Sequence, residues 1–159
     1  MKIKILCIGK LKEKYYKSAV SEFEKRLSRY CSTEFIELAD EKAPESLSPA
    51  QKEQIKDAEG IRLLSRISPQ DYTVALAIEG EKLSSLAFAK KLESWMSSGK
   101  STIAFIIGGS LGLSGDVFKR ADFSLSFSDM TFSHQIFRVM LTEQIYRAFR
   151  IIHNEPYHK

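Results

Sequence analysis

The sequence has few cysteines and no long apolar run. Its 159 residues include only Cys7 and Cys31, which lie 24 positions apart and form no Cys-x-x-Cys motif. This usage argues against a disulfide framework and indicates buried, reduced thiols. No apolar stretch approaches the roughly 20 residues of a membrane-spanning helix. The N-terminus, MKIKILCIGK, alternates charged and apolar residues and does not resemble a signal peptide. We therefore expect a cytoplasmic protein that does not bind a membrane.

Histidine and excess charge are also scarce. His153 and His158 lie five positions apart without cysteine or carboxylate neighbours at metal-ligand spacing, so no metal site is expected. The formal net charge is only +4, from 24 Lys and Arg against 20 Asp and Glu. Residues 1–30 are more basic, with nine Lys and Arg against three Glu. This distribution mildly favours a polyanionic partner.

The order of apolar segments predicts one α/β domain over residues 1–159. Hydrophobic residues make up 43% of the chain, which is enough to build a core without covalent staples. We expect strands at 3–8, 35–38, 72–79, 102–107 and 123–127, the third ending at Gly80. We expect helices at 11–31, 49–68, 83–98, 115–121 and 132–152, with Ser48 as the N-cap of the second. This alternation indicates a mostly parallel sheet with helices on both faces.

A glycine-rich segment, IGGSLGL at 107–113, follows the fourth expected strand. Glycines allow a sharp turn and expose backbone N–H groups at the edge where parallel sheets bind ligands. A simple tight turn explains the same pattern. A dinucleotide fingerprint is a weaker explanation, although Asp129 lies 20 residues beyond Gly109: position 107 is isoleucine, and only 30 residues follow Asp129. No phosphate-loop GKS or GKT is present.

The segment FSDMTFSHQ, at 127–135, separates the fifth expected strand from the last helix. Its small polar residues suit a helix cap, with Thr131 or Ser133 as the capping residue. Alternatively, its backbone amides and carbonyls face the glycine loop and hold the edge of a purine.

Four polar residues, His134, Arg138, Glu143 and Arg147, interrupt the apolar stripe of the last helix. Glu143 and Arg147 have the i,i+4 spacing of an ordinary surface ion pair. His134 and Glu143 are nine positions apart, about two and a half turns, so they point to opposite sides of a straight helix. Either His134 precedes the regular helix, or an active site is shared between subunits.

The chain ends in NEPYHK, in which Pro156 stops the helix. Such a tail is commonly frayed. If it is ordered, Tyr157 can stack on a base and His158 can transfer a proton near neutral pH.

Four stretches together resemble the RlmH family of SPOUT-class enzymes, which methylate N3 of a pseudouridine in large-subunit ribosomal RNA. They are KIKILCIGKLKEKY, TIAFIIGGSLGL, LSFSDMTFSHQIFRVMLTEQIYRAF and NEPYHK, and they span the whole chain. The resemblance implies a SPOUT-type α/β knot, a C-terminal trefoil in which the last helix threads behind the loops that hold S-adenosylmethionine. It also implies a homodimer that acts on 23S ribosomal RNA within the ribosome.

The resemblance places the cofactor pocket on three segments of this chain. Its residues are Leu76, Gly108, Gly109, Gly112, Phe127, Ser128, Asp129, Met130, Thr131 and Phe132. The catalytic candidates are His134, Arg138, Glu143, Arg147, Tyr157 and His158. Our hypothesis is that the two arginines bind phosphate or base oxygens and that the tail closes over the target. Glu143 or His158 then assists removal of the N3 proton.

RNA contact is expected from basic residues near the first helix. They are Lys10, Lys12, Lys14, Lys25, Arg26 and Arg29. Because three glutamates dilute this stripe, a solvated helix face is an equally simple interpretation. Two other functions stay open, a Rossmann-like nucleotide-binding oxidoreductase and a non-catalytic ribosome-associated binding module.

Overall fold

Ten elements alternate along the computed structural model, which describes residues 1–159. The strands are β1 (Lys2–Ile8), β2 (Ser32–Leu38), β3 (Tyr72–Lys82), β4 (Thr102–Ile107) and β5 (Phe123–Ser126). The helices are α1 (Lys14–Leu27), α2 (Pro49–Leu64), α3 (Ser85–Ser97), α4 (Gly115–Arg120) and α5 (His134–Ile152). Every expected strand and helix is present in the expected order. None of the helices is both long and apolar enough to span a lipid bilayer.

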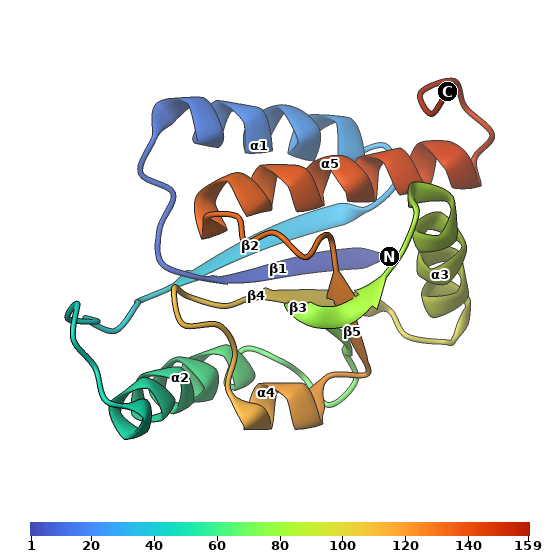
Figure 1. Ribbon diagram of the computed structural model, residues 1–159. Coiled ribbons are helices and arrows are strands. Elements are labelled where there is room, and N and C mark those ends of the chain that lie inside the picture. The colour runs from blue at the N-terminus through green and yellow to red at the C-terminus, as the bar shows by residue number, and fades with distance from the viewer.

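The five strands form one parallel sheet in the order β2-β1-β4-β3-β5. Helices α1, α3 and α5 cover one face, while α2 and α4 cover the other (Figure 1). Successive side chains of a strand point to opposite faces. Ile5 of β1 therefore joins the larger core cluster under α1, α3 and α5, and Leu6 joins the smaller cluster under α2 and α4. The predicted parallel α/β sheet with two covered faces is confirmed.

Helix α1 is shorter than predicted at its N-terminal end. It begins at Lys14 instead of residue 11, and the backbone of its N-cap residue Glu13 is extended. The Leu11 N–H donates to Glu37 Oε1 at 2.8 Å, and the Lys12 N–H donates to Gln135 Oε1 at 3.2 Å. These contacts join the β1–α1 connection to β2 and to the first turn of α5.

The prediction that β3 ends at Gly80 is wrong. The strand continues to Lys82, with a register shift against β5 between Leu76 and Glu81. A Cβ atom at Gly80 would lie 2.6 Å from the carbonyl carbon of Leu125. Glycine is used here for close approach of two backbones, not for chain termination. The trefoil threading that the resemblance implies stays a prediction, since strand order does not describe how one segment passes through another.

Serine side chains cap the start of four helices, α2, α3, α4 and α5. Ser48 accepts a hydrogen bond from the Gln51 N–H, and Gln51 returns the interaction by accepting one from the Ser48 N–H, which forms a capping box. Ser133 accepts from the Ile136 N–H and is the cap of α5, so Thr131 is not. The segment 127–132 is therefore left as a loop between β5 and α5.

Candidate functional site

The largest candidate site is a cavity of about 900 Å³ at the carboxyl ends of β3, β4 and β5. Three chain segments meet there: the end of β3, the glycine loop after β4 and the loop between β5 and α5. Nine of the ten residues predicted for the cofactor pocket line it, and they are Leu76, Gly108, Gly109, Gly112, Phe127, Ser128, Met130, Thr131 and Phe132. The tenth, Asp129, turns its carboxylate to solvent, where it pairs with Lys82 Nζ at 2.5 Å.

The glycine loop forms a tight turn and also lines the cavity. The Gly112 N–H donates to the Gly109 carbonyl at 3.1 Å, and Gly112 has a φ of +89°. A Cβ atom on Gly108 would lie 2.8 Å from the backbone of Gly112. The loop therefore folds back on itself at a distance that only glycine permits, and its bare backbone faces the cavity.

The cavity combines apolar walls with a few polar groups. Leu76, Ile107 and Phe137 contribute apolar surface. Hydroxyls of Ser128 and Thr131, and the backbone of the glycine loop, contribute hydrogen-bonding groups. Such a lining suits a small ligand that carries both a flat ring and a polar end.

His134 lies at the first turn of α5 and lines this cavity. A Cβ atom on Gly9, which has a φ of +82°, would lie 3.5 Å from its Nε2 atom. Burial lowers the pKa of His134, and the positive charge of Arg138 adds to the effect. The imidazole is therefore neutral at pH 7 and offers a nitrogen acceptor to the cavity.

Arg138 does not occupy the position that the predicted phosphate or base contact requires. Its side chain is fully buried, and its Nη1 atom lies 2.7 Å from Glu37 Oε1. Its Nη2 atom donates to the carbonyls of Ile8 at 3.1 Å and Gly9 at 2.7 Å. We correct the prediction: in this structure Arg138 joins α5 to the carboxyl ends of β1 and β2, and it has no surface to offer to RNA.

The residues predicted to act on the target form a second cluster further along α5. Glu143 Oε1 accepts hydrogen bonds from Arg147 Nη2 at 2.6 Å and from the Tyr157 hydroxyl at 3.1 Å. The Arg147 guanidinium lies 4.7 Å from the centre of the Tyr157 ring. Burial raises the pKa of Tyr157, and its hydrogen bond to the Glu143 carboxylate adds to the rise. His158 follows this cluster in the chain.

The C-terminal tail is held against the fold and is not frayed. Arg150 Nη2 donates to the Pro156 carbonyl at 2.9 Å, and Arg150 Nη1 lies 3.1 Å from Glu155 Oε2. The same carboxylate accepts a hydrogen bond from the Tyr30 hydroxyl. The tail therefore presents Tyr157 in a fixed place.

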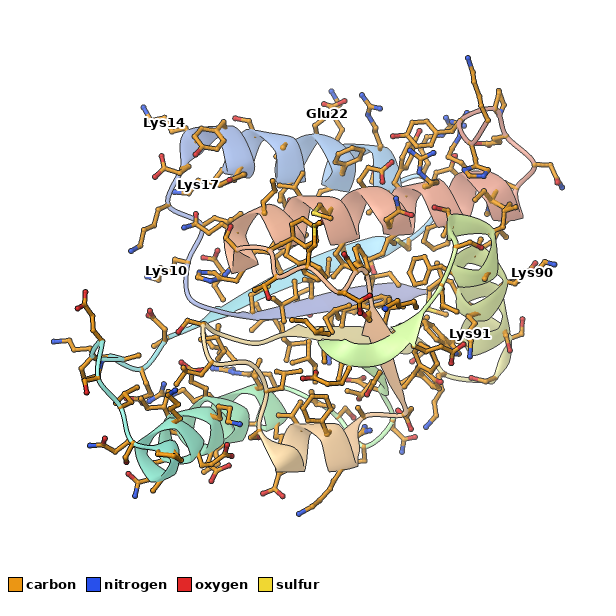
Figure 2. The ribbon with its side chains drawn as sticks, in the orientation of Figure 1. Lys10, Lys14, Lys17, Glu22, Lys90 and Lys91 are labelled. Atoms are coloured by element: carbon orange, nitrogen blue, oxygen red, sulfur yellow. The ribbon has the colours of Figure 1, made fainter.

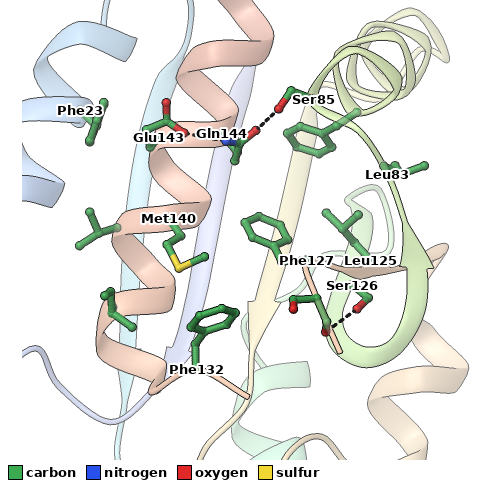
Figure 3. Close-up of a pocket in the computed structure, with 14 residues that line it drawn as sticks. Phe23, Leu83, Ser85, Leu125, Ser126, Phe127, Phe132, Met140, Glu143 and Gln144 are labelled. Carbon is green, nitrogen blue, oxygen red and sulfur yellow. Dashed lines mark hydrogen bonds between the residues drawn. The ribbon is translucent and has the colours of Figure 1, made fainter. Parts of the chain in front are cut away.

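A second cavity, of about 530 Å³, lies beside the first (Figure 3). The two share a wall formed by residues 125–128 and Phe132. Glu143 and Gln144 line the second cavity only, and Gln144 accepts a hydrogen bond from Ser85 at 2.9 Å. His134 and Glu143 thus line different cavities, as their helical spacing predicts. Nine residues along α5 correspond to about 13 Å.

The predicted basic stripe is divided between the two ends of α1. At the N-terminal end, the Lys12 N–H donates to Gln135 in the first turn of α5, and Figure 2 shows Lys10 and Lys14 at the same end of α1. At the other end, the Arg26 guanidinium lies 5.9 Å from the ring centre of Tyr146, near the Glu143 cluster. Lys25 and Arg29 belong to this second group.

Sequence reasoning missed several residues of the larger cavity. Residues 77–79 line it, and their place at the carboxyl end of a predicted strand was a usable signal. Lys56, Phe118 and Phe137 come from three helices. Nothing in their sequence context marks them, because only the packing of those helices brings them to the cavity.

Known proteins resemble this chain over its whole length. A family model described as "Predicted SPOUT methyltransferase" matches residues 1–158. The chain belongs to the SPOUT methyltransferase family. Three curated relatives match it over 159 residues, with all of each chain covered. Ribosomal RNA large subunit methyltransferase H 1 of Clostridium perfringens strain SM101 is 54% identical. The proteins named Ribosomal RNA large subunit methyltransferase H of Exiguobacterium sp. strain AT1b and Bacillus cytotoxicus are 55% and 57% identical.

A solved structure supports the fold of this SPOUT methyltransferase. "The structure of a probable methylase family protein from Haemophilus influenzae Rd KW20" superposes with a TM-score of 0.57 at 14% identity. The match covers 99% of this chain and 70% of the other. Family membership replaces the oxidoreductase and non-catalytic alternatives. The position of Asp129 also argues against the oxidoreductase. An acid that binds a nucleotide ribose would have to line the cavity, whereas Asp129 pairs with Lys82 outside it.

Proposed function

We propose that this SPOUT methyltransferase methylates N3 of a pseudouridine in the 23S ribosomal RNA of assembled ribosomes, with S-adenosylmethionine as the methyl donor. The observation that carries the proposal is the meeting of three separate segments around one cavity of about 900 Å³. The names of the full-length relatives, at 54% to 57% identity, support ribosomal RNA of the large subunit as the substrate.

The larger cavity has the features that the proposed donor needs. Leu76, the glycine loop at 108–112 and the loop at 127–132 hold it, and the Asp129 carboxylate takes no part because it faces Lys82. S-adenosylmethionine, when bound, supplies an electrophilic methyl group on a positively charged sulfur. The apolar walls exclude water from the reacting atoms, and the tight backbone of the glycine loop orients the polar end of the ligand.

The second cluster orients the target. Arg147 donates to a base or phosphate oxygen, while Tyr157 and His158 close over the nucleotide. Glu143 already accepts bonds from Arg147 and Tyr157, so it holds both groups in place and is one candidate to receive the N3 proton. His158 is the other candidate, because it directly follows Tyr157 in the chain and its imidazole has a nitrogen that can accept a proton.

The enzyme works as a homodimer in this proposal. His134 and Glu143 line different cavities of one subunit, and about 13 Å of helix separates them. A second subunit can bring its Glu143 cluster to the donor cavity of the first. The two basic groups at the ends of α1 then both border a shared site, where they contact ribosomal RNA through its phosphates.

Ribosomes purified from a strain that lacks the enzyme provide the test. Calorimetry measures binding of S-adenosylmethionine, and transfer of a labelled methyl group is followed into free 23S RNA, large subunits and joined ribosomes. We expect saturable donor binding and one labelled pseudouridine, with joined ribosomes as the best substrate. Absence of donor binding, or label at another atom, overturns the proposal.

Variants of the second cluster test the assignment of its residues. Glu143→Gln, Arg147→Ala and His158→Ala should lower kcat at least tenfold while donor affinity stays within twofold. Glu93→Gln, an exposed change on α3, is the matched control. Wild-type rates in all three cluster variants would reject the assigned roles.

A further inference from the structure

Helix α2 packs against the glycine loop. Its neighbouring residues Glu59 and Gly60 are both buried, with Glu59 only 4% exposed. A Cβ atom on Gly109 would lie 2.8 Å from Glu59 Oε2 and 3.2 Å from Oε1. A Cβ atom on Gly60 would collide with the hydroxyl of Ser114. The pair therefore touches the loop near both of its ends.

Only one of the two carboxyl oxygens of Glu59 has a hydrogen-bond partner, and helix packing does not explain why. Its Oε1 atom accepts a hydrogen bond from the Glu41 N–H at 3.0 Å, whereas Oε2 is buried and has no partner. Burial raises the pKa of this carboxyl. Leaving a polar oxygen buried and unpaired is unfavourable, so an apolar residue would serve packing alone better.

The position of the unpaired oxygen points to the loop. A side chain at position 109 would meet this oxygen before any other atom, and Gly109 also lines the donor cavity. Ile8 Cγ2 closes the gap beside it, since it would lie 3.1 Å from a Cβ atom on Gly109. A side chain at position 109 would therefore force the Glu59 carboxyl to shift, and the same contact limits how far the loop can move towards α2.

We propose that Glu59 is a positioning residue for the methyl donor. Its carboxyl, seated behind Gly109, sets the path of the glycine loop and so the placement of the loop amides that face the donor. Gly60 fixes the other end of the loop by allowing α2 to approach Ser114, the N-cap of α4. This inference rests on the proposed function, because it assigns Glu59 a part in donor binding.

A double-mutant cycle between Glu59 and Gly109 tests the proposal. Glu59→Ala and Gly109→Ala are each expected to weaken binding of S-adenosylmethionine at least tenfold by calorimetry. The double variant should bind the donor more tightly than Gly109→Ala alone, because removal of the carboxyl makes room for the new methyl group. Losses that simply multiply would overturn the direct contact.

A kinetic split separates positioning from general stability. Glu59→Ala and Glu59→Gln should each raise the KM for S-adenosylmethionine and leave the KM for ribosomes and the kcat unchanged. Asp57→Asn, an exposed change on the same helix, should change none of these values. Glu59→Gln preserves the shape of the side chain, so it provides the comparison if Glu59→Ala does not fold. In Glu59→Gln, a carboxamide group of nearly the same shape replaces the carboxyl group behind Gly109.

The results distinguish this inference from the proposed function. A wild-type enzyme that does not bind the donor overturns both. A wild-type enzyme that binds it, together with Glu59→Gln and Glu59→Ala variants of unchanged donor affinity, overturns only the role of Glu59. A rise in donor KM at wild-type kcat, with recovery in the double variant, supports it.

Discussion

Replacing Arg138 with methionine should destabilise the fold strongly, although the sequence alone suggested that this arginine binds RNA. Methionine keeps most of the length of the buried stem but removes every donor. The carbonyls of Ile8 and Gly9 lose the bonds of 3.1 Å and 2.7 Å that they receive from Nη2. Glu37 loses its partner at 2.7 Å but keeps the Leu11 N–H.

The magnitude follows from these orphaned acceptors. Each buried acceptor without a partner costs about 1–3 kcal/mol. The two carbonyls therefore account for about 2–6 kcal/mol, and Glu37 adds little because it is partly exposed and regains water. Breaking a buried charge pair by removing one partner costs about 3–5 kcal/mol, which agrees. A loss of this size is a large fraction of a total stability of about 5–15 kcal/mol.

Urea unfolding followed by circular dichroism measures the change. All variants are compared at one protein concentration, because subunit association adds to apparent stability. Arg26→Met is the matched control: Arg26 pairs with Glu22 at 2.8 Å on the surface of α1 and lies 5.9 Å from the Tyr146 ring centre, so its loss should cost no more than about 1 kcal/mol. Arg138→Lys should fall between the two, since one ammonium cannot reproduce the planar fork of donors.

A loss of less than about 1 kcal/mol in Arg138→Met would refute the reasoning. So would a variant of wild-type stability whose only defect is weaker binding to ribosomes. That result would return Arg138 to the role predicted from the sequence.

Three further predictions follow from local features of the fold. Ser48→Ala removes the capping box of α2 and should lower the free energy of unfolding by about 1 kcal/mol, while Ser46→Ala, which caps no helix, should not. Burial raises the pKa of Cys7 to about 12 and that of Cys31 to about 11, so neither thiol should react with iodoacetamide at pH 8 until the protein unfolds; rapid native labelling contradicts this. The pKa of His134 is lowered in the folded state, so the unfolded chain binds the proton first. Stability should therefore fall as the pH drops below the ordinary value of 6.5, and a His134→Gln variant should lose that part of the pH dependence in urea titrations from pH 8 to 5.

Local signals were sufficient for the order of the elements. The apolar run at 102–107 matches β4 residue for residue, and Ser48 with Pro49 marks the start of α2. The N-terminal limit of α1 was less predictable: the segment before Lys14 is tied to Glu37 and Gln135, which are distant in sequence. The role of Gly80 could not be predicted either, because it depends on close approach to the backbone of Leu125, which lies on another strand.

The candidate site shows the same division between local and distant information. Family motifs located the glycine loop and the loop at 127–132, and helical spacing placed His134 and Glu143 on different sides of α5. The chemical type of Arg138 suggested a phosphate contact, but burial decided otherwise. Glu59 carried no sequence signal, because a glutamate within a helix is ordinary until its packing partner is known.

The sequence by itself determined the alternation of strands and helices, the cap of α2 at Ser48 and the position of the glycine turn. These features depend on the periodicity of apolar residues and on hydrogen bonds between neighbours in the chain. The tertiary structure alone decided which polar groups are buried, which carbonyls Arg138 binds and which side chain lies behind Gly109. Those outcomes depend on atoms brought together from distant segments, and the free energy of burying a charge is set by the partners it meets there.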